Sequence, residues 1–364
     1  MNIRTETGLL APGAMEYRPL GTTGLMVSAF CLGTMTFGEQ NSEAEGHEQL
    51  DFALDHGINF IDTAEMYAIP PKPETQGSTE RIIGTWLAAR GNRDKIVLAT
   101  KVSGRSPNGW LRDDGAPTRL TRRQIDEAVH KSLKRLQTDY IDLYQVHYPE
   151  RPVPQFGSNP VIWRTPEPAA DETAIEESLD ALDAHVKAGR IRHIGLSNET
   201  AWGTMRWLGA AAQSGAARVQ SIQNAYSLVN RTFEVNLAEV ALREKVGLLA
   251  YSALAQGYLT GKYRNGALPA GARKTLFNRL QRYETPHADA AVAAYCDLAA
   301  EHGLDPSQMA LAFAVSRPFV TSVILGATTM SQLTTCMGAT GVTISPELEA
   351  AIDAIHLRHT NPCP

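Results

Sequence analysis

Short apolar runs alternate with amphipathic stretches along most of this 364-residue chain. Eight of the runs, each three to six residues long, have the length and composition of buried β-strands. Strands this short, separated by helical patterns, predict a parallel sheet with helices on its outer face. The expected strands are 29–32, 59–61, 96–100, 141–146, 191–196, 219–223, 247–251 and 323–325.

Apolar residues spaced three and four apart predict a helix after each of these strands. Ser78, Thr121 and Ser345 are expected N-caps, Thr121–Gln124 has the spacing of a capping box, and Pro346 suits a first helical position. The expected helices are 43–56, 78–89, 121–136, 173–188, 200–212, 232–244, 288–302, 306–316, one from 331, and 346–359.

Eight strand–helix repeats in one chain of this length favour a closed (β/α)8 TIM barrel of the α/β class, formed as a single domain by residues 15–364. An N-terminal β-hairpin at 17–27 is expected before the barrel and a C-terminal helix after it, and 1–14 is expected to be a flexible leader. An open doubly wound sheet is the alternative, but no Gly-x-Gly-x-x-Gly follows the first strand.

Long loops follow the third, fourth and seventh strands, at 103–120, 148–171 and 261–286. Each follows the carboxyl end of a strand, where the active site of a barrel lies. Long loops without secondary structure in a compact domain usually have a function. We therefore expect the site at this face.

Polar residues end three successive apolar runs. Asp62 ends the second run, Lys101 the third and His147 the fourth, and Tyr67 follows Asp62 by five residues. Taken singly, each has an ordinary explanation: Asp62 as a helix N-cap, Tyr67 as a packed aromatic, Lys101 as a solvated charge and His147 as a structural histidine. Together, at one end of one barrel, they have the pattern of a catalytic site.

These four side chains suit one chemistry. A phenol titrates at about pH 10 in water, so it needs a nearby ammonium to give up its proton readily near neutral pH. A carboxylate can hold that ammonium in place, and an imidazole can donate a hydrogen bond to a substrate oxygen. The set could protonate a carbonyl oxygen while a hydride attacks the carbon. No metal is required.

Composition excludes several other classes of protein. The net charge is −5 and the pI about 6.1, with no basic block that would suit nucleic acid. The four cysteines are far apart and form no Cys-x-x-Cys pair, so neither a zinc site nor a disulfide framework is indicated and a cytoplasmic location is expected. The first 14 residues lack the apolar core of a signal peptide, and no apolar run is long enough for a bilayer.

Several long motifs resemble the aldo-keto reductases. They are Gly-Ile-Asn-Phe-Ile-Asp-Thr-Ala-Glu-Met-Tyr at 57–67, Lys101, and the stretches 133–147, 188–198 and 325–329; the resemblance covers about 15–360. Residues 33–44 and 73–77 are similar to the Tas-like branch of bacterial NADP(H)-dependent aldo-keto reductases. The resemblance implies reversible, NADPH-dependent reduction of small aldehydes and ketones. It makes Tyr67 the general acid, Lys101 and Asp62 the pair that tunes it, and His147 the group that orients the carbonyl.

The resemblance also implies a binding site for NADP(H). Ser197, Asn198 and Gln223 would bind the nicotinamide carboxamide, and Tyr251 would stack on the ring. The remaining nucleotide contacts would come from the loop residues Gly33, Thr34 and Met35, from Ser252, Leu254, Gln256, Gly257 and Leu259 along the pyrophosphate, from Lys262 and Arg273 at the 2′-phosphate, and from Gly326, Thr328 and Gln332 at the adenosine.

Two positions at the adenosine end depart from the family pattern: Thr335 and Cys336 stand where an acidic residue and an asparagine are common. Without the resemblance, Lys262 and Arg273 could equally be solvated surface charges. Apart from the resemblance, the nucleotide site is supported only by backbone N–H groups at a loop and at a helix start, which can hold phosphate oxygens.

Substrate contacts are expected from Phe37, Tyr67, Trp110 and His147. Two other functions remain open at this point. Some barrels of this family act as nucleotide-binding regulatory or sensor subunits with slow chemistry, and a strand-end lysine such as Lys101 could instead form a Schiff base in an aldolase. The oligomeric state and the physiological substrate are left open.

Overall fold

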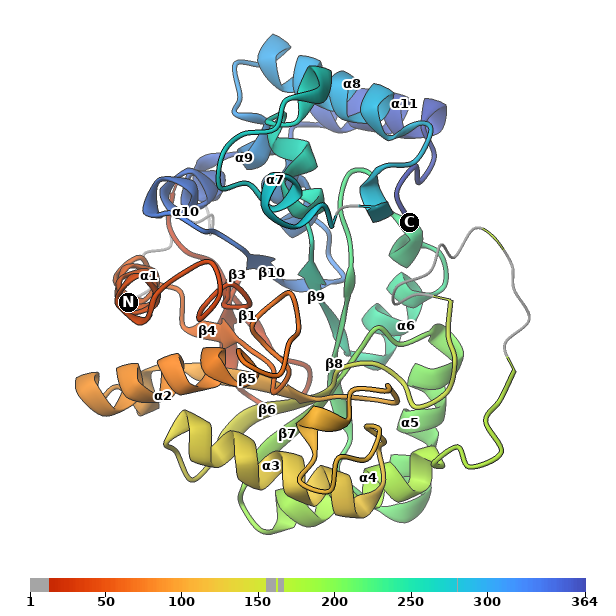
Figure 1. Ribbon diagram of the computed structural model, residues 1–364. Helices are drawn as coiled ribbons and strands as arrows, with labels where there is room; N and C mark the ends of the chain where they lie inside the picture. The colour runs from red at the N-terminus through yellow and green to blue at the C-terminus, as the bar shows by residue number, and fades with distance from the viewer. Residues whose placement is uncertain (1–12, 155–161, 163–166, 280) are drawn as a thin grey trace, which may run out of the picture.

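A computed structural model describes residues 13–154, 162, 167–279 and 281–364 (Figure 1). Eight parallel strands form a closed barrel in the order β10-β3-β4-β5-β6-β7-β8-β9, which confirms the predicted (β/α)8 fold. The ring closes where β10 pairs with β3, with Val323 opposite Phe30. The strands are β3 (Phe30–Gly33), β4 (Phe60–Asp62), β5 (Val97–Val102), β6 (Ile141–Val146), β7 (Ile191–Ser197), β8 (Val219–Ala225), β9 (Gly247–Tyr251) and β10 (Val320–Leu325).

Helices surround this barrel and cover the outer faces of its strands (Figure 1). Every residue of β5 and β6 is buried, because side chains point either into the barrel or against the helices. The helices are α1 (Glu43–Asp55), α2 (Ser78–Arg90), α3 (Arg122–Leu136), α4 (Ile175–Lys187), α5 (Ala201–Ser214), α6 (Leu237–Glu244), α7 (Arg273–Phe277), α8 (Ala288–Glu301), α9 (Pro306–Val315), α10 (Met330–Met337) and α11 (Pro346–Arg358). None of the helices in the described part of the chain has the length and apolarity needed to cross a membrane.

The predicted N-terminal hairpin is present as β1 (Tyr17–Pro19) and β2 (Met26–Ser28), which pair antiparallel. Its turn meets the start of β8: the backbone N–H of Thr22 donates to Gln220 Oε1 at 2.8 Å. A Cβ at Gly21 would lie 2.5 Å from that same oxygen, so only glycine fits there. Leu20 and Val27 are fully buried in a cluster with residues of β3, β4, β5, β6 and β9. The hairpin therefore closes the amino-terminal end of the barrel.

Two predicted helix starts are confirmed and one is wrong. Thr121 caps α3 by accepting from the Gln124 N–H, and Ser345 caps α11, with Pro346 in its first turn. Ser78 is not an N-cap: it is the first residue of α2, and Gly77 precedes it with φ of 69°. The Ser78 hydroxyl donates to the Thr75 carbonyl at 2.6 Å, and no side chain caps this helix start.

Two further details differ from the prediction. The capping box at Thr121 is only half formed, because the side-chain oxygen of Gln124 accepts from the Arg119 N–H at 2.7 Å instead of from the cap residue. The helix expected at 232–244 is split into a 3₁₀ turn (Thr232–Glu234) and α6, with Asn236 at a φ of 67° between them. A residue in that conformation cannot continue a helix.

The long loops at the carboxyl face contain short structured segments. Besides the turn at Thr232–Glu234, these loops contain 3₁₀ turns at Gly109–Leu111, Ala255–Thr260, Arg264–Gly266 and Gln281–Tyr283. Two further 3₁₀ turns lie elsewhere, at Arg93–Lys95 before β5 and at Gly338–Gly341 after α10. Most of the predicted leader and part of the loop at 148–171 lie outside the described residues.

Candidate active site

The structure brings the four predicted catalytic side chains together at the carboxyl ends of β4, β5 and β6. Lys101 Nζ lies 2.5 Å from Asp62 Oδ2 and 5.0 Å from the centroid of the Tyr67 ring. The ring centroids of Tyr67 and His147 are 5.6 Å apart, with the rings nearly perpendicular. Side chains from three neighbouring strand ends therefore face one point.

Lys101 is completely buried, with a relative exposure of 0%. Besides Asp62, its ammonium donates to the Thr63 carbonyl at 2.7 Å. Burial acts to lower the pKa of Lys101, but the nearby Asp62 and Tyr67 outweigh it and the pKa is raised above its ordinary value. Lys101 is thus a fixed positive charge at neutral pH.

Tyr67 is only partly exposed, and burial raises the pKa of its phenol above the ordinary value. Lys101 opposes this effect and Asp62 adds to it. The expected lowering of the pKa by Lys101 is therefore present but is outweighed. The phenol carries its proton at neutral pH, with an ammonium beside it to stabilise the phenolate that proton loss would leave.

Burial holds the pKa of His147 well below its ordinary value, and the positive charge of Lys101 lowers it further. The imidazole is therefore neutral at neutral pH and has one N–H to donate. Its backbone is fixed at both sides: the N–H donates to the Val102 carbonyl at 2.8 Å, and the carbonyl accepts from Asn198 Nδ2 at 2.8 Å.

Two glutamine amides meet at the other oxygen of Asp62. Gln145 Nε2 and Gln223 Nε2 donate to Asp62 Oδ1 at 3.0 and 2.8 Å, and Gln223 Nε2 also lies 3.2 Å from Gln145 Oε1. Gln145 was not among the residues predicted from the sequence. A signal was available, because Gln145 stands two residues before His147 in a buried strand, and such residues share a face.

A second buried pair ties two loops beside the site. Arg112 Nη1 and Nη2 donate to Glu65 Oε2 and Oε1 at 2.9 and 3.0 Å, and both side chains are essentially unexposed, at 0% and 1%. Glu65 also accepts from the Ser103 N–H at 2.8 Å. The pair joins the loop that carries Tyr67 to the loop that carries Trp110, and the sequence interpretation missed it.

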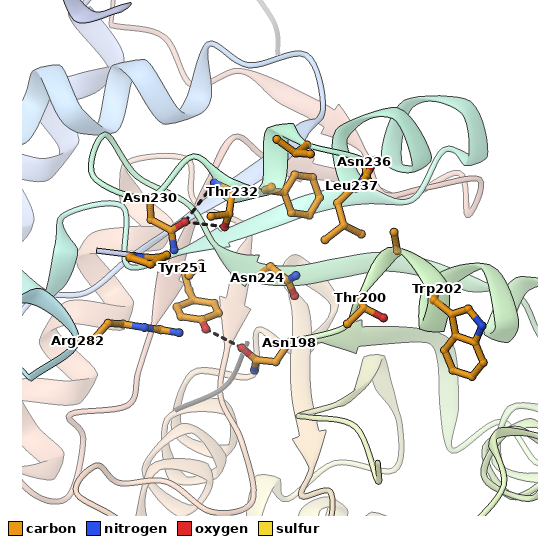
Figure 2. A pocket seen from close by; sticks show the side chains of 15 residues that line it. Asn198, Thr200, Trp202, Asn224, Asn230, Thr232, Asn236, Leu237, Tyr251 and Arg282 are labelled. Carbon is orange, nitrogen blue, oxygen red and sulfur yellow. Dashed lines mark hydrogen bonds between the residues drawn. The ribbon is translucent and has the colours of Figure 1, made fainter. Parts of the chain in front are cut away.

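The residues predicted at the nicotinamide end are linked to one another. Tyr251 donates from its hydroxyl to Asn198 Oδ1 at 2.6 Å, and the Ser197 hydroxyl donates to the Gln223 carbonyl at 2.8 Å. Figure 2 shows Tyr251 and Asn198 pointing toward each other, with Arg282 beside them. They lie on one wall of a cavity of about 310 Å³, which the start of α5, the β8–α6 connection and Arg282 also line.

The loop after β9 has an unusual backbone, because Ser252, Ala255, Gln256 and Gly257 all have positive φ. The N–H groups of Ala255 and Gly257 donate within the loop, to the carbonyls of Ser252 and Leu254 at 2.7 and 2.8 Å. Gly257 has a φ of 101°, which favours glycine, and the end of the Lys262 side chain packs against it, with Cε 2.7 Å from where a Cβ would lie. The side chain of Leu259 is buried in the core, so only the backbone of this residue is available for contacts at the loop.

Lys262 and Arg273 lie near each other, and no carboxylate pairs with either one among the residues described. Burial lowers the pKa of both side chains, and the positive charge of Arg273 lowers that of Lys262 further. Arg273 also approaches Met35, with Nη2 3.8 Å from its sulfur. Two close, poorly solvated cations would be stabilised by an anion between them.

The two other predicted nucleotide segments also meet nearby. Asn41 Nδ2 donates to the Thr328 carbonyl at 2.9 Å, which ties the loop after β3 to the start of α10. The Thr328 N–H in turn donates to Gln332 Oε1 at 3.0 Å. Thr34 faces the catalytic side, with its hydroxyl 2.8 Å from the Asp62 carbonyl.

Of the predicted substrate contacts, Trp110 lies beside the site, whereas Phe37 is buried in the core. Trp110 packs beside Tyr67, Met66 and Tyr148 in a small apolar cluster. Phe37 is fully buried, and its ring packs where a side chain on Gly46 of α1 would lie, so the structure does not bring it to the open face of the site. Within the described residues there is no group of three His, Cys, Asp or Glu side chains that could hold a metal.

Comparison with known proteins agrees with this geometry. The sequence model of the aldo/keto reductase family matches residues 29–356. The chain belongs to the aldo/keto reductase family. It is 54% identical to the protein tas of Escherichia coli over 96% of this chain and the whole of that protein. It is 34% identical to the uncharacterized oxidoreductase YrpG of Bacillus subtilis, over 92% and 94% of the two chains.

A further relative is a probable voltage-gated potassium channel subunit beta of Arabidopsis thaliana, 32% identical over 90% of this chain and 92% of that one. The extended match to tas confirms the predicted resemblance to the Tas-like aldo-keto reductases. The protein is thus an oxidoreductase of this family.

Proposed function

We propose that this protein reduces aldehydes or ketones to alcohols, reversibly, with NADPH. The observation that carries the proposal is the buried Lys101–Asp62 pair beside Tyr67, with the neutral His147 facing the same point. Small carbonyl compounds are the partners expected for such a site.

In the proposed reaction, each of these four residues has a separate role. NADPH, when bound, supplies the hydride that reduces the carbonyl carbon. Tyr67 donates its proton to the carbonyl oxygen, and His147 donates a hydrogen bond to the same oxygen. Lys101 stabilises the phenolate left on Tyr67, and Asp62 keeps Lys101 charged and in place.

The chain has residues that fit the nucleotide. Lys262 and Arg273 would hold the 2′-phosphate, since two close cations that have no carboxylate partner among the described residues suit a dianion better than a neutral ribose. Ser197, Asn198 and Gln223 would orient the carboxamide beside Tyr251. The positive-φ loop 252–257 would run along the pyrophosphate, and Gly326, Thr328 and Gln332 would lie at the adenosine.

The test is NADPH consumption by the purified protein with a panel of aldehydes, ketones and quinones, with NADH in parallel. Tyr67→Phe should lower turnover by about 10²–10⁴-fold and leave the NADPH dissociation constant unchanged. Tyr140→Phe, at the residue just before β6 at the amino-terminal end of the barrel, is a matched control and should behave as wild type. Full turnover in Tyr67→Phe would refute the assignment of the acid.

A second candidate function is an NADP(H)-binding regulatory subunit with slow chemistry. It is favoured by one observation, the 32% identity to a protein named as a potassium channel subunit beta. Tight NADPH binding with very slow turnover of every carbonyl on the panel would support it.

A Schiff-base aldolase is disfavoured, because the raised pKa of Lys101 keeps it protonated and not nucleophilic. Since all four cysteines are unpaired thiols, we propose the reducing cytoplasm as the location of the reaction.

A further inference from the structure

Gln145 occupies the interior of the barrel beside the Lys101–Asp62 pair. It is fully buried, and in the sheet it lies opposite Lys101 of β5 on one side and Gly195 of β7 on the other. Its amide nitrogen is 3.0 Å from Asp62 Oδ1. Glutamine is expensive to bury unless its amide is satisfied, so the hydrogen bonds at this position decide what it does.

The chemistry of Asp62 fixes the orientation of both amides. An ionised carboxylate only accepts hydrogen bonds, so Gln145 and Gln223 must both turn their N–H groups toward Asp62 Oδ1. The carbonyl oxygen of Gln145 is then left to accept the second N–H of Gln223, at 3.2 Å. Each amide thus fixes the other, and both fix the carboxylate.

The barrel makes room for Gln145 at the neighbouring strand. A Cβ at Gly195 would lie 3.0 Å from Gln145 Cγ and 2.7 Å from Ser221 Oγ. A side chain at 195 would therefore require Gln145 and Ser221 to shift. A glycine inside a strand often marks such a close approach.

We infer that Gln145 is a positioning residue: it holds Asp62 Oδ1 so that Oδ2 faces Lys101, and it sets which end of the Gln223 amide faces Asp62. The inference rests on the proposed function for its effect on turnover. The amide of Gln145 thereby connects Gln223, the predicted carboxamide contact, to the Lys101–Asp62 pair.

The charged and titratable groups around this position are few. Asp62 of β4 and Lys101 of β5 are the nearest, Cys31 of β3 interacts electrostatically with both, and Tyr67 and His147 interact with Lys101. A new carboxyl at 145 would therefore meet the negative charge of Asp62 first.

The first variant is Gln145→Met, which keeps the length of the side chain and removes its hydrogen bonds. We expect kcat to fall by about tenfold with little change in the KM of the carbonyl substrate, as for the loss of one hydrogen bond to a charged group. Gln49→Met is the matched control, because Gln49 is equally buried but lies in α1, away from the site. A kcat within twofold of wild type would overturn the inference.

The second variant is Gln145→Glu, which has nearly the same shape. When protonated, the introduced carboxyl can still donate to Asp62, whereas two ionised carboxylates at this distance repel each other. Burial and the charge of Asp62 should raise the pKa of the introduced group well above its ordinary value of about 4.3. The variant should therefore approach wild-type kcat at about pH 5 and lose activity as the pH rises.

A merely structural role would not produce this pH-dependent rescue. A ratio of wild-type to Gln145→Glu activity that stays constant with pH would contradict a positioning role. This variant also keeps the inference testable if Gln145→Met fails to fold.

A binding measurement separates this inference from the proposed function. Calorimetric titration with NADPH should show about fivefold weaker binding to Gln145→Met, while adenosine 2′,5′-bisphosphate, which lacks the nicotinamide end, should bind both proteins equally. Turnover absent from wild type, with this binding difference intact, would refute the function alone. Equal NADPH affinities, or equal weakening of both ligands, would count against Gln145.

Discussion

Arg112→Met is the change that most directly tests how the two loops beside the site are held together. It removes a guanidinium that makes two parallel hydrogen bonds, of 2.9 and 3.0 Å, to a carboxylate that is itself 1% exposed. Breaking one partner of a buried ion pair destabilises a protein by about 3–5 kcal/mol, because the other charge is stranded.

The structure favours the lower end of that range. The stranded Glu65 would keep the N–H of Ser103 at 2.8 Å, so its charge would not be wholly unsolvated. We therefore expect a loss of about 3 kcal/mol in the free energy of unfolding. With an unfolding entropy of about 2 cal/mol/K per residue, this corresponds to a Tm lower by about 4 °C in thermal unfolding followed by calorimetry.

Two controls make the result interpretable. The double variant Glu65→Met with Arg112→Met removes both charges and should be more stable than Arg112→Met alone. Arg243→Met breaks a pair with Glu239 whose arginine is 76% exposed, and it should change stability by less than about 0.5 kcal/mol. The reasoning would be refuted if Arg112→Met lost less than about 1 kcal/mol, or if the double variant were no better than the single one.

Three other predictions follow from the site. Arg273→Met should weaken NADPH binding by about 10–100-fold and leave NADH binding unchanged, as titration of both nucleotides would show, and equal weakening of both would exclude a 2′-phosphate contact. The pKa of Tyr67 is raised, so the phenol loses its proton only above about pH 10. The pKa of His147 is lowered, so the imidazole gains a proton only at a pH well below the ordinary pKa of histidine. The pH profile of kcat should thus be flat across the neutral range, and an inflection near pH 6.5 that disappears in His147→Gln would contradict it. Gly195→Ala should destabilise the barrel by about 1–3 kcal/mol in urea unfolding, whereas wild-type stability would show that Ser221 and Gln145 can move aside.

The sequence was sufficient for the fold and for the proximity of the four side chains predicted to be catalytic. Apolar runs that end in Asp62, Lys101 and His147 predict strand ends, and parallel strand ends meet at one face, so proximity follows without coordinates. Strand bounds moved by at most three residues, for example from 323–325 to Val320–Leu325, because burial of neighbouring residues extends a ladder beyond its apolar core.

What the sequence could not supply depends on pairing between distant residues. The contact of Gln145 with Asp62 spans 83 positions and that of Arg112 with Glu65 spans 47, and neither follows from a local pattern. Phe37 looked like a loop aromatic, but the absence of a side chain at Gly46 opens a space for it in the core. Ser78 failed as a cap because it is already the first residue of the helix, and Gly77, with a φ of 69°, holds the cap position.

The hairpin at the amino-terminal end of the barrel has a consequence for how Tyr67 regains its proton. Leu20 and Val27 are fully buried and close that end of the barrel. In the proposed reaction, substrate and solvent would both reach Tyr67 and Lys101 from the carboxyl face. In the proposed reaction, the proton given up by Tyr67 must therefore be replaced from that same face, so its return is tied to the departure of the alcohol.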